Sequence, residues 1–223
     1  MVNKVLIAAA AADALFLASG ILELTFSVIV KNDMVNDPSD GRDAIRHLIY
    51  ERMPLTAGIV NAGFILAAFL ATLPGLLMPT TRGWLKFAGY FVTFCTIFTM
   101  CVGVYLWIMT LRIGEDFFEV YMDLDADVQA LVQTTFECCG YKSSTSPAFI
   151  TNPTCPSPAA AALLPGCQAA VSNFANVLLD QIFTAVFGVV GIDVVFILAI
   201  ACLSKDRKER EWYRRVDQKR SFW

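Results

Sequence analysis

Four apolar stretches, each long enough to cross a lipid bilayer as a helix, constrain the fold of this 223-residue chain more than any other feature. They cover residues 5–30, 54–77, 84–111 and 177–203. A spanning helix needs about 20 residues, and lipid offers no partner to the polar groups of irregular backbone. Buried helices of a soluble protein are the alternative, but four such stretches in one short chain argue against it. The sequence therefore predicts an all-α membrane protein with four transmembrane helices.

Composition agrees with this interpretation and excludes several classes of function. The chain is 57% hydrophobic and 17% charged, whereas soluble domains are about 45–50% apolar and about 25% charged. The net charge of −3 does not suit a nucleic-acid-binding protein, which carries a basic surface. His47 is the only histidine, so neither a histidine metal site nor a Ser-His-Asp triad is expected. The sequence also contains no Cys-x-x-Cys pair, and we expect no enzymatic activity, no metal and no cofactor.

Lysine and arginine collect in cytosolic loops, and their distribution here favours cytosolic termini. The tail 204–223 carries eight of them: Lys205, Arg207, Lys208, Arg210, Arg214, Arg215, Lys219 and Arg220. The predicted cytosolic segments are the N-terminus 1–4, the loop 78–83 and this basic tail. The small and large non-cytosolic loops are then residues 31–53 and 112–176. A basic segment beside a membrane also attracts anionic lipid, by about 1 kcal/mol per charge, so the tail is expected to bind it.

The large loop begins with a helical pattern that continues from the third span. Apolar residues at spacings of three or four form one face: Ile113, Phe117, Tyr121, Leu124, Val128, Leu131, Thr135 and Phe136. We therefore expect a long extramembrane helix to extend span three, and an independent helix after a hinge at Gly114 is the alternative. The Ser-, Pro-, Thr- and Ala-rich segment 141–165 lacks periodicity, and a helical pattern resumes at Gln168 and leads into the fourth span.

Four of the seven cysteines lie in the large loop, which indicates two disulfides in an oxidising compartment. They are Cys138, Cys139, Cys155 and Cys167. A bond between the adjacent Cys138 and Cys139 would be strained, and the two remaining pairings both stay open at this point. A zinc site is the competing interpretation, but adjacent cysteines lack the usual gap of two to four residues between ligands.

The arrangement of spans, loops and cysteines resembles the tetraspanin family. The resemblance covers nearly the whole chain and is carried by the large second loop, in which Cys138-Cys139-Gly140 follows a helix that continues from span three. Pro153-Thr154-Cys155 is similar to the family's Pro-x-Ser-Cys element, with the proline one place closer and Thr in place of Ser. Pro165-Gly166-Cys167 supplies the last cysteine. The resemblance implies a large extracellular loop in which Cys138 pairs with Cys167, and Cys139 with Cys155.

The family's functional properties enter as expectations of the same resemblance. A tetraspanin is a non-enzymatic scaffold that organises partner proteins laterally in its own bilayer. The expected partners are membrane proteins, membrane lipid and further copies of the chain, and the expected location is the plasma membrane or an endosomal or vacuolar membrane. The segment 141–165 is the expected recognition surface. Few cysteines and no glycosylation sequon make the chain most similar to tetraspanins of filamentous fungi implicated in appressorium-mediated host penetration, which implies a role in pathogenicity.

Ionisable groups inside a membrane are costly, by about 2.5–3.5 kcal/mol each, and usually face the interior of the helix bundle. Asp13 and Asp193, in the first and fourth spans, lie at similar depth from the cytosolic ends of these spans. Glu23 and Asn61, in the first and second spans, lie at similar depth from the outer ends. Two polar layers are therefore predicted, one formed by Asp13 with Asp193 and the other by Glu23 with Asn61.

These groups support a second functional hypothesis. Two close carboxylates cannot both ionise readily, so Asp13 and Asp193 could form a proton-sensitive site. Tetraspanins commonly place a polar residue in span one and Glu or Gln in span four, and some hold a sterol between the helices, which implies a sterol-hydroxyl site here. The alternative function is thus a small sterol-binding or proton-sensitive transporter-like protein, although the sequence shows none of the internal repeats common in transporters. Hydrogen bonds that merely join the helices would explain the same residues.

Three residues near the predicted cytosolic side match short modification or sorting patterns. Cys202 is the free cysteine best placed for palmitoylation, and a plain buried thiol is the alternative. Tyr213 and Val216, in the run Tyr-Arg-Arg-Val, fit a tyrosine-based endocytic sorting signal. Such short patterns also occur by chance, and the basic residues around them are explained by membrane topology alone.

Overall fold

The computed structural model of the chain describes residues 4–78, 82–146 and 148–220, and within them the side chains of Arg82, residues 113–116 and Lys219 are not described. Residues 1–3 of the predicted N-terminal segment and residues 79–81 of the predicted cytosolic loop lie outside the described residues. All regular structure in the described residues is helical, with two isolated β-bridges in the segment 143–148. Four helices are long: α1 (Lys4–Asp33), α3 (Leu55–Leu77), α4 (Arg82–Asp123) and α7 (Gln168–Arg220). Three are short: α2 (Gly41–Arg52), α5 (Ala126–Phe136) and α6 (Pro158–Ala161).

The long helices confirm the all-α class and the number of candidate spans. Four helices in the described residues are long and apolar enough to cross a membrane, which indicates a multi-pass membrane protein. Two of them continue well beyond the apolar stretches seen in the sequence. The apolar part of α4 is Gly83–Arg112, but the helix itself continues to Asp123. Helix α7 begins at Gln168, before the predicted fourth span, and continues to Arg220.

The chain divides into two compact units. The first, called the bundle here, comprises Met1–Val28, Thr56–Gly103 and Ala185–Trp223. The second, called the head here, comprises Ile29–Leu55 and Val104–Thr184. Each unit therefore draws on segments that are far apart in the sequence.

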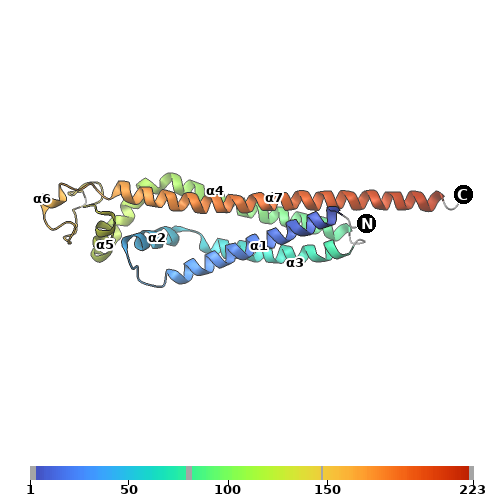
Figure 1. The fold of residues 1–223 in the computed structure, drawn as a ribbon, viewed down its shortest axis with the longest axis horizontal. Coiled ribbons are helices and arrows are strands. Elements are labelled where there is room, and N and C mark those ends of the chain that lie inside the picture. Colours follow the sequence, from blue (N-terminus) through green and yellow to red (C-terminus); the bar gives the residue numbers. More distant parts are fainter. Residues whose placement is uncertain (1–3, 79–81, 147, 221–223) are drawn as a thin grey trace. The chain divides into compact units, whose positions relative to one another are not determined.

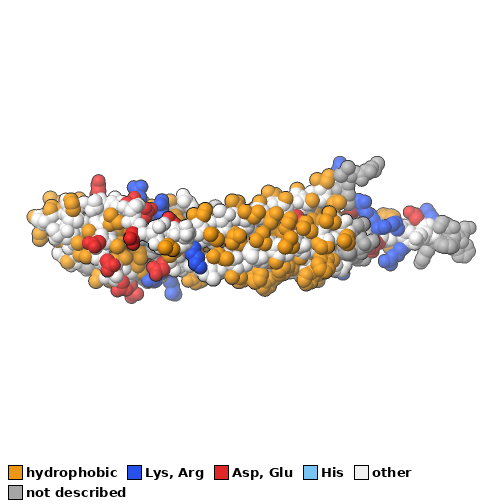
Figure 2. All heavy atoms as spheres, turned by 90° about the horizontal axis from the view of Figure 1, so that it is seen from below, with side chains coloured by type: hydrophobic (Ala, Val, Ile, Leu, Met, Phe, Trp, Pro, Cys, Tyr) orange, Lys and Arg blue, Asp and Glu red, His pale blue; other side chains and the backbone are white. Residues whose placement is uncertain are grey.

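The bundle contains parts of the helices α1, α3, α4 and α7 (Figure 1), and these four helices share one apolar core. The buried core residues are Ala9, Ala12, Phe16, Ile65, Ala68, Leu85, Val92, Cys95, Phe196, Ile200 and Leu203. Apolar side chains gather on the outside of the bundle, on the face that Figure 2 shows. Leu22, Leu70 and Phe87 are among the large apolar side chains that are exposed. An apolar exterior around an apolar core is unfavourable in water and is expected for helices that face lipid.

The helical pattern after span three forms two helices, so the single helix predicted over residues 113–136 is only partly correct. Helix α4 continues through Gly114, and the alternative of a hinge at that residue is therefore wrong. The break falls instead between Asp123 and Ala126. The side chain of Gln129 donates to the carbonyls of Tyr121 (3.1 Å) and Leu124 (2.9 Å), which satisfies backbone groups that the end of α4 leaves without helical partners.

The small loop contains a helix that was not predicted from the sequence. Asp40 begins α2 by accepting a hydrogen bond from the backbone N–H of Asp43 at 2.8 Å, a typical N-cap contact. Ile45 and Ile49 are fully buried, and α2 packs against α5. The backbone N–H of Gly41 donates to the Thr135 hydroxyl at 2.9 Å. The small loop is thus part of the folded head rather than a separate polar connection.

Candidate functional site

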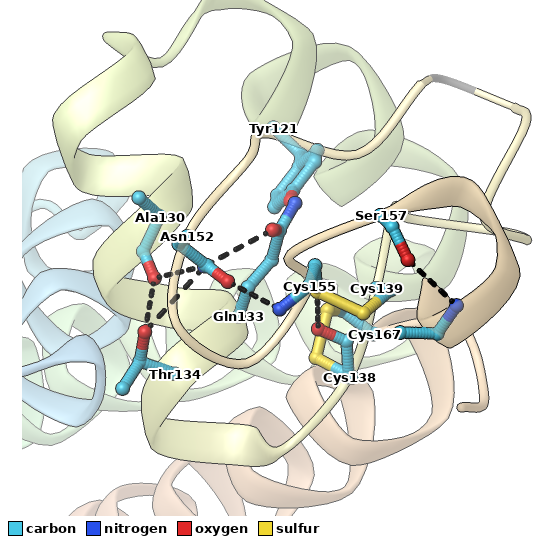
Figure 3. Close-up of a disulfide and its surroundings, with 11 residues drawn as sticks. Tyr121, Ala130, Gln133, Thr134, Cys138, Cys139, Asn152, Cys155, Ser157 and Cys167 are labelled. Carbon is cyan, nitrogen blue, oxygen red and sulfur yellow. Dashed lines mark hydrogen bonds between the residues drawn. A yellow bond between two sulfur atoms is a disulfide. The ribbon is translucent and has the colours of Figure 1, made fainter. Parts of the chain in front are cut away.

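Two disulfides hold the centre of the head (Figure 3). Cys138 pairs with Cys167 and Cys139 with Cys155, which is the pairing implied by the resemblance. The Cα atoms of the two pairs are 5.0 and 6.0 Å apart, within the usual range for disulfides. All four cysteines are buried. Each bridge closes a short stretch of chain, and such bridges contribute about 2–4 kcal/mol to stability.

Gly140 allows the chain to turn directly after the paired cysteines. Its φ of 71° lies in the left-handed region, where a side chain is unfavourable. The turn directs the Gly140 carbonyl toward the backbone N–H of Cys167, which donates to it at 3.0 Å. Gly166 has a different reason for being glycine, because a Cβ atom there would lie 2.4 Å from the Lys142 carbonyl oxygen. These two glycines let the two ends of the segment 141–165 meet.

Asn152 attaches the middle of this segment to α5, a role that was not predicted from the sequence. Its side-chain nitrogen donates to the Ala130 carbonyl at 3.1 Å, and its side-chain oxygen accepts from the backbone N–H of Cys155 at 2.6 Å (Figure 3). The Gln133 amide, fully buried, lies 3.3 Å from the Asn152 side-chain nitrogen. The aperiodic segment is therefore held in one conformation by polar contacts and disulfides rather than by secondary structure.

Buried tyrosines complete the core beneath the segment. The rings of Tyr121 and Tyr141 lie 4.8 Å apart between centroids, and both side chains are almost fully buried. The Tyr121 hydroxyl lies 3.3 Å from the Gln133 amide. Burial raises the pKa of both phenols above the ordinary value, because ionisation would place a charge in a poorly solvated site.

The outer side of the segment presents an exposed apolar residue. Ser157 begins the short helix α6, and its hydroxyl accepts from the Ala160 backbone N–H at 3.3 Å. Leu164 packs against the buried cluster of Cys139, Cys155 and Ala161. Its neighbour Leu163 is 86% exposed, more than any other large apolar side chain in the described residues. The expected recognition segment thus combines a fixed backbone with an accessible apolar contact.

Inside the bundle, Glu23 and Asn61 form the polar contact predicted from their depth. The Asn61 side-chain nitrogen donates to both carboxylate oxygens of Glu23, at 3.1 and 2.9 Å. The Thr99 hydroxyl donates to the Asn61 side-chain oxygen at 3.2 Å, so α4 joins the same group. Thr99 was not predicted from the sequence, because a threonine in an apolar helix usually bonds a carbonyl of its own helix. The Thr99 hydroxyl also lies 2.9 Å from the Cys95 carbonyl oxygen, one turn earlier on α4.

The predicted pairing of Asp13 with Asp193 is not formed. The Asp13 carboxylate instead accepts a hydrogen bond from the Thr72 hydroxyl at 2.8 Å. Asp193 interacts electrostatically with Glu23. Depth counted from the ends of the apolar stretches was misleading because helix ends in the sequence do not determine the register in which the two helices pack.

Asp193 is the most unusual side chain of the bundle. It is fully buried, and neither carboxylate oxygen has a hydrogen-bond partner in the described part of the chain. Cys95, also fully buried, lies within electrostatic range. An isolated charged carboxylate is very costly in such surroundings, so the site favours the protonated acid or a bound group that can pair with it.

The tail residues have different roles from those expected of a uniformly basic surface. Arg207 is 8% exposed and donates to the carbonyls of Gly75, Leu76 and Met78, at 2.6, 3.1 and 3.2 Å. It thereby binds carbonyls at the C-terminal end of α3. Arg210 pairs with Asp206 at 2.9 Å, one turn away on α7. These two arginines are thus engaged within the protein, which reduces the charge available to anionic lipid.

The predicted modification and sorting residues all lie on α7. Cys202 is a free, exposed thiol and is therefore accessible for acylation, although Cys101 is exposed as well. Tyr213 is 61% exposed and Val216 is half-buried. Three positions apart on a helix, they lie on the same side of α7. The palmitoylation and sorting hypotheses remain predictions.

Comparison of the chain with family models, with curated proteins and with solved structures finds no match. The basis for a function is therefore the geometry of the head and of the bundle.

Proposed function

We propose that this chain is a tetraspanin-like, non-enzymatic scaffold that binds partner membrane proteins through the head segment 141–165. The observation that carries this proposal is the way the segment is held: two disulfides and the Asn152 contacts fix an otherwise aperiodic stretch. A fixed backbone loses little conformational entropy when a partner binds, which favours recognition. Leu163, exposed at the end of the segment beside the partly buried Leu164, supplies an apolar contact for the partner.

The proposal places both termini in the cytosol and the head outside it, in the plasma membrane or an endosomal or vacuolar membrane. Two features support this topology. The basic residues of the tail are expected on the cytosolic side, and the disulfides of the head require an oxidising compartment. A role in the infection structures of a filamentous fungus rests on the resemblance of the sequence alone.

The test is a pull-down of the full chain in mild detergent, with the bound proteins identified by mass spectrometry. We expect a specific membrane protein to co-purify, and to be lost when the disulfides are reduced. Leu163→Ser should weaken its capture, because it removes the exposed apolar contact without changing the buried core. Val35→Ser is the matched control, since Val35 is 82% exposed and belongs to the head but lies outside the segment 141–165.

A partner that stays bound after reduction and in the Leu163→Ser variant would rule out recognition by the segment. If the chain is captured without any co-purifying membrane protein, the scaffold function itself is contradicted. In both cases the segment would be a structural cover of the head rather than a recognition surface.

The unpaired carboxyl of Asp193 favours one second candidate, a sterol-binding or proton-sensitive function of the bundle. A buried acid without a partner can donate a hydrogen bond to a lipid hydroxyl or exchange a proton. Labelling by a photo-crosslinkable sterol should then fall in Asp193→Ala, and proton flux into proteoliposomes should fall in Asp193→Asn. Unchanged labelling and unchanged flux in these variants would eliminate the candidate.

A further inference from the structure

The head contains a cavity of about 320 Å³ between α2 and α4 that the proposed scaffold function does not use. Helix α2 contributes Leu48 and Arg52, and helix α4 contributes Ile108, Met109, Arg112 and Phe117. All of these residues belong to the head. The volume is within the range of sites that hold part of a small molecule. Its lining is apolar, apart from two arginines and a tyrosine, Tyr105.

The two arginines give the cavity its chemistry. The side chains of Arg52 and Arg112 are both exposed, and neither takes part in an ion pair with another described residue. A planar guanidinium binds phosphate oxygens through two parallel hydrogen bonds, which a second guanidinium in the same cavity reinforces. Two such cations beside an apolar wall suit a molecule that joins an anionic phosphate to a hydrocarbon chain.

The position of both arginines along their helices points to a membrane lipid rather than a soluble metabolite. Arg112 is the last residue of the apolar part of α4, Gly83–Arg112. Arg52 lies three residues before Leu55, where the apolar helix α3 begins. Both side chains are therefore placed where hydrocarbon gives way to lipid headgroups, the level at which basic and aromatic residues anchor membrane proteins. Ile108 and Met109 lie about one helical turn before Arg112, within the apolar part of α4, and therefore face the hydrocarbon side of the cavity.

We propose that this cavity binds one anionic phospholipid. Its phosphate lies between Arg52 and Arg112, and the start of an acyl chain lies against Tyr105, Ile108 and Met109. The site is separate from the predicted lipid contact of the basic tail, because the tail belongs to the bundle and lines no part of the cavity. It is also independent of partner recognition by the segment 141–165, since none of that segment's residues lines it.

The experiment measures binding of phosphatidylglycerol to the full chain in mild detergent by native mass spectrometry. We expect a single tightly held lipid in the wild type and at least about tenfold weaker binding in Arg52→Gln/Arg112→Gln, a change of about 1.4 kcal/mol. The control is Lys31→Gln/Arg42→Gln, which removes the same charge from exposed residues of the head that do not line the cavity and should bind like the wild type. Met109→Trp tests the wall without changing the charge, because the larger ring fills the cavity, and it should also weaken binding.

Several outcomes would overturn the proposal. An equal loss of phosphatidylglycerol binding in the two double variants would mean that the lipid responds only to the net charge of the head. Phosphatidylcholine bound as tightly as phosphatidylglycerol would mean that the arginines do not select an anion. Displacement of the lipid by millimolar inorganic phosphate would identify a site for a free anion, and unchanged binding in Met109→Trp would place the lipid elsewhere.

Discussion

The rings of Phe16 and Phe196 pack together in the bundle core with their centroids 5.0 Å apart. Asp13 precedes Phe16 by three residues on α1, and Asp193 precedes Phe196 by three residues on α7. If α1 and α7 cross the membrane in opposite directions, the two carboxylates lie on opposite sides of the aromatic pair, about 9 Å apart along the bundle axis. The aromatic contact therefore explains why Asp13 and Asp193 do not meet, and Asp13 instead accepts a hydrogen bond from Thr72.

This register predicts the outcome of cysteine cross-linking. In a background with Cys95, Cys101 and Cys202 replaced by alanine, oxidation should join Phe16→Cys/Phe196→Cys much faster than Asp13→Cys/Asp193→Cys. The reason is that the first pair occupies contacting positions and the second does not. Cross-linking is read from the mobility of protease fragments without reductant. Equal rates for the two pairs would contradict the register.

Substitution of Gly140 should destabilise the head. Gly140→Ala places a side chain at a φ of 71°, and we expect a loss of about 1–2 kcal/mol because left-handed backbone disfavours a Cβ atom. The measurement is the thermal midpoint of the full chain in detergent, followed by near-ultraviolet circular dichroism. Gly188→Ala is the control, since a Cβ atom there would meet nothing within 4 Å. Identical midpoints for Gly140→Ala and the wild type would show that the turn tolerates a side chain.

Arg207 should stabilise the fold through its hydrogen bonds to the carbonyls at the end of α3, and not through its charge alone. Arg207→Lys keeps the charge but loses the planar group that reaches three carbonyls, so we expect a loss of about 1.5–3 kcal/mol. Arg220→Ala, at an exposed position of α7, should leave the midpoint unchanged. Both are measured by thermal unfolding in detergent. A lysine variant as stable as the wild type would mean that charge, not carbonyl binding, explains the buried arginine.

The head should lose stability in alkali. Burial raises the pKa of Tyr121 and Tyr141 above 10, so the folded head holds these protons more tightly than the unfolded chain. The stabilisation is complete below pH 10 and is lost as the pH rises through the folded pKa values. Near-ultraviolet circular dichroism against pH should show this loss, and Tyr121→Phe should shift it to higher pH because one ionising group is gone. A Tyr121→Phe profile identical to that of the wild type would exclude this residue as a cause.

Much of the fold could be predicted from the sequence, because the relevant signals are local. Apolar stretches of sufficient length indicate the four long helices whatever they pack against. Four clustered cysteines indicate disulfides. Similar depth correctly paired Glu23 with Asn61, although the same argument failed for Asp13 and Asp193. By contrast, α2 was not predicted, although Asp40 is a good N-cap and Ala44, Ile45 and Ile49 form an apolar face at helical spacing; the local pattern does not record that this face packs against α5.

Contacts between distant segments were decided only by the tertiary structure. The sequence determined that this chain forms four long apolar helices and a cysteine-rich head, because helix length and composition are properties of each segment by itself. Arg207 binds the end of α3, Asn152 binds α5, and Phe16 packs against Phe196. Each of these contacts joins segments that are more than twenty residues apart in the sequence. Such contacts depend on the rotation and register of packed helices, which small changes in side-chain shape determine and which no local pattern records.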